Sequence, residues 1–281
     1  MSKEFTKEDV IQNKKEAIRS LNKLIESYIN DPSDKHLKKA HLISFWLKDY
    51  VRFLNFEEEF DPTRNIAYKR GNIVKLNFGF NIGSEYGGLH YAVVLDNKND
   101  HNSPVLTVIP LTSIKDSKSV HHNSVDLGSE IYRLLKLKHD TILKSVKDET
   151  DEVDKMVCVF SELIRTSRFT LDELKKLDQN SSDFKEKIAN TNKNLDVADH
   201  LKYTLSQKSE HNFEMLAELE KIGKEIAHMK KGSIALVNQI TTISKMRIFD
   251  PRNLKGVLAG VSLSEESMDK INQKVKELYI F

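Results

Sequence analysis

Cysteine and proline are scarce in this 281-residue chain, and neither sign of charge dominates. The single cysteine, Cys158, excludes an internal disulfide and a cysteine-rich zinc site, and it fits a reducing compartment. Lys and Arg number 44 against 42 Asp and Glu, which leaves a net charge of +2. Overall charge therefore gives no argument for binding nucleic acid, whereas a local basic face is still allowed.

Long apolar runs are also missing. No segment approaches the roughly 18 apolar residues that a membrane-spanning helix needs, and the opening MSKEFTKEDV lacks the apolar core of a signal peptide. We therefore expect a cytoplasmic protein without membrane contact. A hydrophobic fraction of 39% and a charged fraction of 31% are typical of globular domains, and the length suffices for one large or two ordinary ones.

The first 60 residues show the 3–4 spacing of two amphipathic helices. Thr6 can cap the first helix, and Asn30-Asp31-Pro32 ends it, because proline cannot continue a helical hydrogen-bond ladder. Ser33 or Asp34 can cap the second helix. We expect residues 1–60 to form an antiparallel helical hairpin.

Strand patterns follow, with period-two alternation or short apolar runs. Pro110 is expected to end the third of these strands. The predicted strands are 72–80, 91–95, 105–109, 120–127 and 233–237.

Helical periodicity returns at residue 129 and persists to 231. Thr170 opens an apparent capping box, residues 190–194 form a polar break, and heptad-like spacing beyond it predicts a coiled-coil arm. Ser264 can cap a last helix. The predicted class is α+β, with one small β domain split by a helical insertion. Its expected parts are a hairpin at 1–60, the β domain at 66–128 plus 232–281, and the insertion at 129–231.

Four segments, in this order along the chain, resemble the PemK/MazF toxin family. They are Arg70 to Val74, the glycine-rich Gly83 to Val94, Val108 to Ser113, and Ser233 to Arg247 with its Gln-x-x-Thr-Ile-x-Lys-x-Arg ending. The closing helix agrees as well. The resemblance covers 68–127 and 232–281, and it says nothing of the N-terminal helices or of the insertion.

The resemblance implies an SH3-like β barrel, usually a homodimer. It implies a type II toxin that cuts single-stranded RNA at short sequences, needs no metal or cofactor, and is blocked by a cognate antitoxin. Such cleavage uses the neighbouring 2′-OH as nucleophile and leaves a 2′,3′-cyclic phosphate and a 5′-OH. The protein must remove the 2′-OH proton, stabilise charge on the phosphate and protonate the leaving oxygen.

The resemblance points to His90, Thr112 and Ser113 as the catalytic residues. His90 stands where many family members carry an Arg, and histidine, with an ordinary pKa near 6.5, can accept or donate a proton where arginine stays protonated. Thr112 matches the family's catalytic Thr and would bond a phosphate oxygen or the 2′-OH, with Ser113 assisting. The alternatives are a histidine packed at a strand start and a hydroxyl that caps the backbone.

The expected substrate-binding residues are Ser84, Glu85, Gly87, Gly88 and Gln239. Glycine N–H groups can approach a phosphate closely. Glu85 holds either the turn or a base edge. Gln239 either reads a base or is a polar residue on a strand surface.

Other residues bear less directly on the expected activity. Thr241 and Ser244 occupy positions where many members carry Arg and Asp, which leaves more of the proton transfer to His90. The lysines of the loop 114–118 can attract phosphate. His121-His122 has no carboxylates at metal-ligand spacing, so we expect a solvated loop and no metal.

The rival hypothesis is a binding module. The same barrel fold hosts non-catalytic inhibitors that bind proteins such as DNA gyrase, and a degenerate toxin would keep only a protein partner. Convergence of His90 and Thr112 on one cleft would favour the enzyme.

Overall fold

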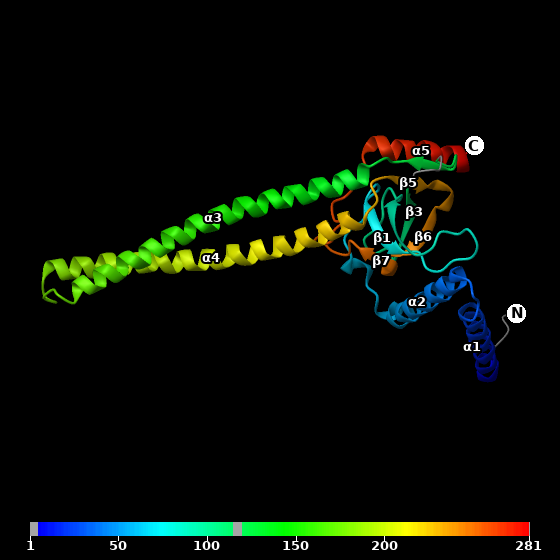
Figure 1. Ribbon diagram of the computed structural model, residues 1–281, viewed down its shortest axis with the longest axis horizontal. Helices are drawn as coiled ribbons and strands as arrows, with labels where there is room; N and C mark the ends of the chain where they lie inside the picture. The colour runs from blue at the N-terminus through cyan, green and yellow to red at the C-terminus, as the bar shows by residue number, and fades with distance from the viewer. Residues whose placement is uncertain (1–4, 115–119, 281) are drawn as a thin grey trace. The chain divides into compact units, whose positions relative to one another are not determined.

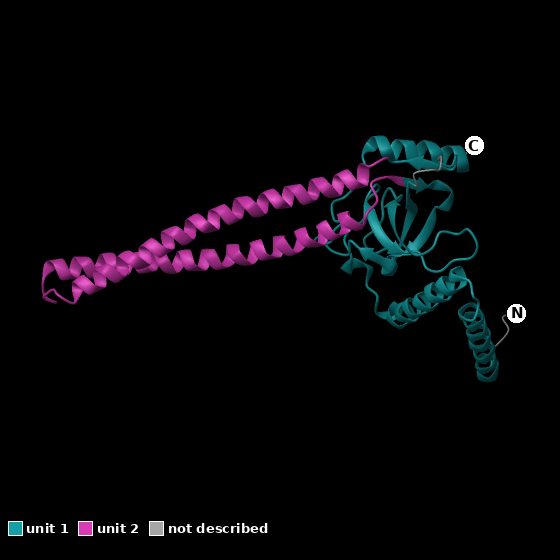
Figure 2. Ribbon diagram, in the orientation of Figure 1, with its two compact units in different colours: residues 1–127, 234–281 teal, residues 128–233 magenta. Residues whose placement is uncertain are grey.

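The computed structural model describes residues 5–114 and 120–280 of the chain. It divides into two compact units (Figure 2). One comprises residues 1–127 and 234–281, and the other comprises residues 128–233. Among the described helices, none has a stretch long and apolar enough to cross a bilayer.

Two helices open the first unit, α1 (Lys7–Ile29) and α2 (Asp34–Phe56). Thr6 caps α1 in a complete capping box with Asp9, as predicted. Ser33 is the N-cap of α2, but its side chain makes no capping hydrogen bond. The contacts between the helices include stacking of Tyr28 on His36, while α1 has no buried residue. The helical pair is therefore present, but the apolar stripe of α1 stays exposed.

Seven strands form one sheet. They are β1 (Ile73–Asn77), β2 (Leu89–Val94), β3 (Val105–Ser113), β4 (Ser124–Asp126), β5 (Ser233–Leu236), β6 (Thr241–Ser244) and β7 (Ile248–Asp250). The order is β4-β5-β3-β2-β1-β7, with β6 also paired to β3. Figure 1 shows these strands gathered in the first unit. The predicted α+β class is confirmed, and the strand path is open, running from β4 to β7.

Pro110 does not end β3, contrary to the prediction. The strand runs on to Ser113, with Pro110 opposite Ala92 of β2. Proline only removes one donor, and the buried side chains on either side of it, such as Ile109 and Leu111, favour continuing the strand. This extension carries Thr112 and Ser113 on the sheet itself.

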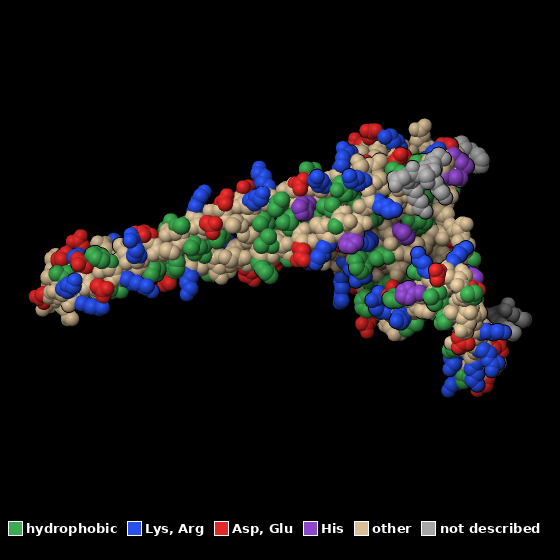
Figure 3. All heavy atoms as spheres, in the orientation of Figure 1, with side chains coloured by type: hydrophobic (Ala, Val, Ile, Leu, Met, Phe, Trp, Pro, Cys, Tyr) green, Lys and Arg blue, Asp and Glu red, His purple; other side chains and the backbone are tan. Residues whose placement is uncertain are grey.

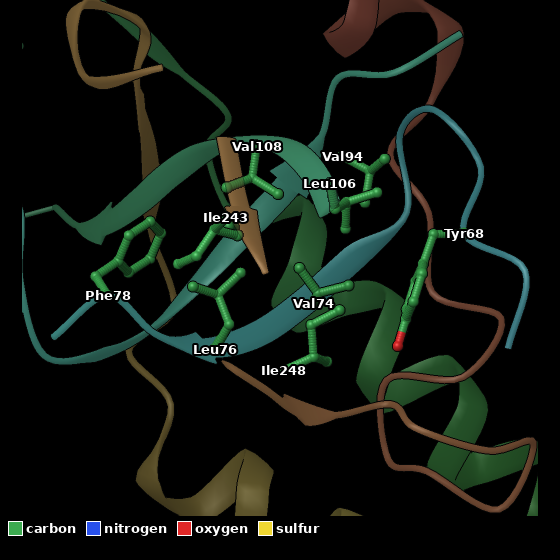
Figure 4. Close-up of a cluster of buried hydrophobic side chains, with 10 residues drawn as sticks. Tyr68, Val74, Leu76, Phe78, Val94, Leu106, Val108, Ile243 and Ile248 are labelled. Atoms are coloured by element: carbon green, nitrogen blue, oxygen red, sulfur yellow. The ribbon is translucent and has the colours of Figure 1, made fainter. Parts of the chain in front are cut away.

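One cluster of buried side chains in the first unit lies on one face of this sheet. Figure 4 shows its side chains, which come from β1, β2, β3, β6 and β7. Its labelled members are Tyr68, Val74, Leu76, Phe78, Val94, Leu106, Val108, Ile243 and Ile248. The Tyr68 hydroxyl donates to the Pro251 carbonyl at 2.7 Å, which satisfies the one polar atom of that ring.

Short 3₁₀ turns and a last helix complete the unit. The turns are η1 (Glu57–Glu59), η2 (Pro62–Arg64), η3 (Val237–Gln239) and η4 (Lys245–Arg247). The helix α5 (Glu265–Tyr279) begins at Ser264, whose side chain accepts from the Ser267 N–H as predicted. It buries Met268 and Ile271.

The second unit is a pair of long helices, α3 (Glu130–Leu174) and α4 (Ser182–His228). Two predictions here are wrong. Thr170 does not open a helix, since its hydroxyl donates to the Thr166 carbonyl inside α3. Residues 190–194 lie within α4. The break falls at 175–181 instead, where Ser181 caps α4 by accepting from the Phe184 N–H at 3.2 Å.

Charged side chains of both signs alternate along this helical pair (Figure 3). Several of them bridge the two helices, including Glu152 with Lys208 at 2.9 Å and Lys138 with Glu218 at 3.4 Å. The backbone N–H of Ser233 donates to the Gly128 carbonyl at 2.9 Å, so the two ends of the pair meet.

Candidate functional site

The glycine-rich loop between β1 and β2 closes on itself through backbone contacts. The Phe78 N–H donates to the Gly88 carbonyl at 2.8 Å, and the Gly88 N–H donates to the Gly79 carbonyl at 2.7 Å. A Cβ at Gly87 would lie 2.7 Å from the Gly79 oxygen, so only glycine fits there. Gly88 has a φ of 91°, a conformation that glycine adopts without strain. The glycines therefore shape the loop, and the Gly88 N–H is already engaged.

Two of the expected substrate-binding side chains, those of Glu85 and Gln239, are hydrogen-bonded to this loop. The Glu85 carboxylate accepts from the Ile82 N–H at 3.2 Å, which is the turn-holding role. The Gln239 side chain accepts from the Tyr86 N–H at 3.3 Å and donates to the Ser84 carbonyl at 3.4 Å. Gln239 thus braces the loop from η3, and it contributes to the site by positioning Ser84 and Tyr86.

His90 is the second residue of β2, opposite Leu76 of β1. Its ring lies 4.7 Å, centroid to centroid, from the Tyr86 ring. Burial lowers the pKa of His90 below its usual 6.5, and a hydrogen bond with the Gly87 backbone offsets part of that shift. Because this hydrogen bond favours the protonated ring, the ring must donate it, and the acceptor is the Gly87 carbonyl. One ring nitrogen therefore holds the N–H, and the other can accept a proton near neutral pH.

Tyr86 connects His90 to Thr112. Its hydroxyl donates to the Leu111 carbonyl at 2.6 Å and is also hydrogen-bonded by the Thr112 side chain. Burial raises the pKa of Tyr86, so the phenol stays protonated at neutral pH. The structure thus brings His90, Tyr86 and Thr112 into one contiguous set. The sequence analysis does not single out Tyr86, which stands four residues before His90.

Ser113 follows Thr112 as the last residue of β3 and is half-buried. Its neighbour Ile114 is the last described residue before the gap, and the loop lysines Lys115 and Lys118 lie outside the described residues. Thr241 and Ser244 lie at the two ends of β6, paired with Val108 and Val105 of β3.

A groove of about 890 Å³ opens beside His90, between the glycine-rich loop and α2, and neither Tyr86 nor Thr112 is among its lining residues. His90, Glu85 and Gly87 line one side of it. The other side comes from α2, with the exposed lysines Lys35, Lys38 and Lys39 and, further along, Trp46 and Asp49. The Asn77 side chain donates to Asp49 at 3.0 Å and fixes α2 against β1. Sequence reasoning did not place α2 at the site.

Arg247 lies beneath this helix. Its guanidinium donates to the Phe78 carbonyl at 2.9 Å and sits 4.8 Å from the centre of the Trp46 ring, in a cation–π arrangement. The Arg247 Nε is buried without a hydrogen-bond partner. Burial also lowers the pKa of Arg247. Trp46 and Arg247 therefore form the contact between α2 and the sheet.

The two adjacent histidines, His121 and His122, pack against each other with ring centroids 4.3 Å apart. Within the described part of the chain, no three His, Cys, Asp or Glu side chains are grouped to hold a metal ion.

Residues 69–150 match the family model of the PemK-like, MazF-like toxin of type II toxin–antitoxin systems. The resemblance is therefore confirmed for residues 69–150, which match this toxin domain. The match spans β1 to β4 and the first part of α3 and does not include 233–247. No curated protein matches the chain.

Proposed function

We propose that this protein is the toxin of a type II toxin–antitoxin pair and acts as a metal-independent endoribonuclease on single-stranded RNA. The observation that carries the proposal is the connection of His90 to Thr112 through Tyr86, beside a groove bearing three lysines. A cognate antitoxin, a homodimeric assembly and a cytoplasmic location belong to the same proposal, on the strength of the family match.

Each step of the reaction has a candidate group. His90, with a pKa below 6.5, accepts the proton of the 2′-OH. The Thr112 hydroxyl, which donates to the Tyr86 oxygen in the free protein, turns its hydrogen to an oxygen of the phosphate as negative charge develops. Protonated His90 then returns its proton to the leaving 5′-oxygen, which gives a 2′,3′-cyclic phosphate and a 5′-OH. Lys35, Lys38 and Lys39 attract neighbouring phosphates of the strand.

The test is cleavage of a long single-stranded RNA by purified protein in the presence of EDTA. We expect cuts at a short recurring sequence, with cyclic-phosphate ends. His90→Ala should abolish them. Tyr86→Phe, which keeps the ring but removes the hydroxyl that Thr112 contacts, should slow them about 10-fold or more. Cuts that persist in His90→Ala would move the chemistry to Thr112 and its neighbours.

One observation favours the alternative, a non-catalytic binding module. The Gly88 N–H and the Gln239 side chain are both occupied by contacts within the protein, which leaves them unavailable to RNA in this conformation. Absence of cleavage by wild-type protein shown to be free of a co-purified antitoxin would support that alternative.

A further inference from the structure

A second cavity, of about 610 Å³, lies at the C-terminal half of α2. It is bounded by α2, by the segment that contains η1 and η2, and by β7 with the residues that flank it. Nothing in the catalytic proposal uses it. Two kinds of side chain dominate its lining, aromatic rings and cations.

Phenylalanine rings supply the flat apolar surfaces. Phe53, Phe56, Phe60 and Phe249 line the cavity. Phe56 and Phe60 meet edge to face with centroids 6.2 Å apart, which leaves ring faces open to a further planar group. Phe249 is the middle residue of β7. Its side chain is 62% exposed, although the neighbouring Ile248 is buried in the core. A large ring exposed at the rim of a cavity is suited to stacking on a planar ligand.

Cations supply the charge. Arg52, Arg64, Arg252 and Lys245 line the same cavity, against the single lining carboxylate of Asp61 among the described residues. Asp61 lies 3.9 Å from Arg64, so it offsets only part of this charge. Lys245 is 1% exposed, and its ammonium donates to the carbonyl oxygens of Asp100 and His101, at 2.9 and 3.3 Å. Arg52 is paired with Asp49 at 3.1 Å, so an anion in the cavity would meet mainly the guanidinium groups of Arg64 and Arg252.

We propose that this cavity binds a nucleotide. The base stacks on the phenylalanine rings, and the phosphate lies on the guanidinium groups, whose planar forks match phosphate oxygens. A purely apolar ligand would leave the guanidinium groups unused, and inorganic phosphate would leave the rings unused. The nucleotide is either free or one residue of an RNA strand, because both present the same base and phosphate.

The sheet places the cavity near the candidate catalytic residues. Leu76 of β1 lies opposite His90 of β2 on one side and opposite Ile248 of β7 on the other. Neighbouring strands are about 4.8 Å apart, so His90 and Ile248 are separated by about 10 Å across the sheet. Helix α2 lines both the groove at His90 and this cavity, so an RNA strand that follows α2 can place a nucleotide beside Phe249 and a phosphate near His90. Binding of an RNA strand in this way rests on the proposed ribonuclease function, whereas binding of a free nucleotide does not.

The experiment measures binding of RNA and nucleotides to the full-length protein and does not measure cleavage. A fluorescently labelled RNA oligonucleotide with 2′-O-methyl riboses, which block transesterification, is titrated, and AMP, UMP, GMP, CMP and inorganic phosphate are tested as competitors. The variants are Phe249→Ala and Arg64→Gln, both at exposed side chains. The matched controls are Leu254→Ala, an 83% exposed apolar residue outside the cavity, and Arg19→Gln on α1.

We expect Phe249→Ala to weaken binding at least about fivefold, since base–aromatic stacking is typically lost on truncation to alanine. Arg64→Gln should weaken it as well, and both controls should bind as wild type. Competition by mononucleotides that is lost in Phe249→Ala identifies a free nucleotide as a ligand. An effect on the oligonucleotide alone identifies a residue of a strand. Either result supports the site, even if the protein cuts no RNA.

Three results would overturn the proposal. The first is unchanged binding of all probes in both variants. The second is competition by inorganic phosphate as strong as that by mononucleotides and insensitive to Phe249→Ala, which would define a plain anion site. The third is a dimer that dissociates in Phe249→Ala, as measured by sedimentation, which would make this face a contact between copies.

Discussion

At the residue scale, His90 is the group whose protonation links stability to pH. Burial lowers its pKa in the folded state, so between that value and about 6.5 the unfolded chain binds more protons than the folded one. The stabilisation by neutral His90 is therefore complete above about pH 6.5 and is lost as the pH falls towards the folded-state pKa.

We predict that the free energy of unfolding of the wild type falls on acidification below about pH 6.5 and that His90→Gln reduces this fall. Urea unfolding between pH 5 and 8 measures it. His122→Gln, at an exposed histidine, is the matched control and should keep the wild-type profile. An identical pH profile in His90→Gln would mean that His90 is not buried in solution as it is here.

Gly87 is the second residue whose substitution has a definite expected effect. A methyl group at Gly87 would lie 2.7 Å from the Gly79 carbonyl oxygen, so Gly87→Ala must open the loop that holds Tyr86 and His90. We predict a loss of about 1–3 kcal/mol in the free energy of unfolding and loss of RNA cleavage. Chemical unfolding and the EDTA cleavage assay measure the two effects.

Gly223→Ala is the control for that substitution. The nearest atom to a Cβ at Gly223 is His139 Nε2 at 3.8 Å, an ordinary contact, and the residue lies inside α4. It should therefore stabilise the protein by up to about 1 kcal/mol, since alanine is a better helix former than glycine. Equal losses in the two variants would contradict the steric argument.

At the scale of elements, α2 is held on the sheet by few contacts. Trp46 covers Arg247 and Gly79, and Asp49 bonds Asn77. We predict that Trp46→Ala accelerates hydrogen exchange of the α2 amides about 10-fold while the strands exchange as before. Phe45→Ala is the control, because the neighbouring Phe45 ring is 55% exposed and should leave exchange unchanged. Faster exchange in the strands of Trp46→Ala would show instead that α2 and the sheet unfold together.

Elements with a strong local signal could be predicted from the sequence. The caps at Thr6 and Ser264 and the stop at Asn30-Asp31-Pro32 are confirmed, because each acts through its own backbone within a few residues. The predictions of a helix start at Thr170 and of a break at residues 190–194 are wrong, because contacts between α3 and α4 outweigh a local capping or turn preference.

The site could be predicted only in part. The family resemblance pointed to His90, Thr112 and the loop between β1 and β2, and their catalytic roles stay predictions. It could not show that Tyr86 joins them, that Gln239 braces the loop, or that α2 lines the groove, because these are contacts between side chains far apart in the chain. Arg247 was visible only as the last residue of a motif, and its burial under Trp46 depends on how α2 packs.

At the scale of the whole molecule, the helical pair α3–α4 begins and ends at one point. The Gly128 carbonyl and the Ser233 N–H are hydrogen-bonded at 2.9 Å, so a short linker can replace everything between them. We predict that replacing residues 130–231 by a short Gly/Ser linker leaves the sheet folded, with a melting temperature within about 5 °C of the wild type. Circular dichroism and the fluorescence of Trp46, the only tryptophan, measure it.

The same shortened protein separates the possible roles of the insertion. Unchanged cleavage specificity and an unchanged oligomeric state would exclude both an RNA-binding role and a docking role for α3–α4. An insoluble product would contradict the independence of the sheet. Altered cut sites would show instead that the helices contact RNA.

The turn at 175–181 has a different consequence. Cutting the chain there would yield two polypeptides, 1–178 with His90 and Thr112, and 179–281 with β5, β6, β7 and Arg247. Neither contains a complete sheet. The first fragment ends with α3 and the second begins with α4, its partner helix, and the ion pair of Glu152 with Lys208 is one of the contacts that join them. Co-expression should then reconstitute the proposed ribonuclease activity where either fragment alone has none. The protein would thus become a two-chain enzyme whose assembly depends on the pairing of α3 with α4.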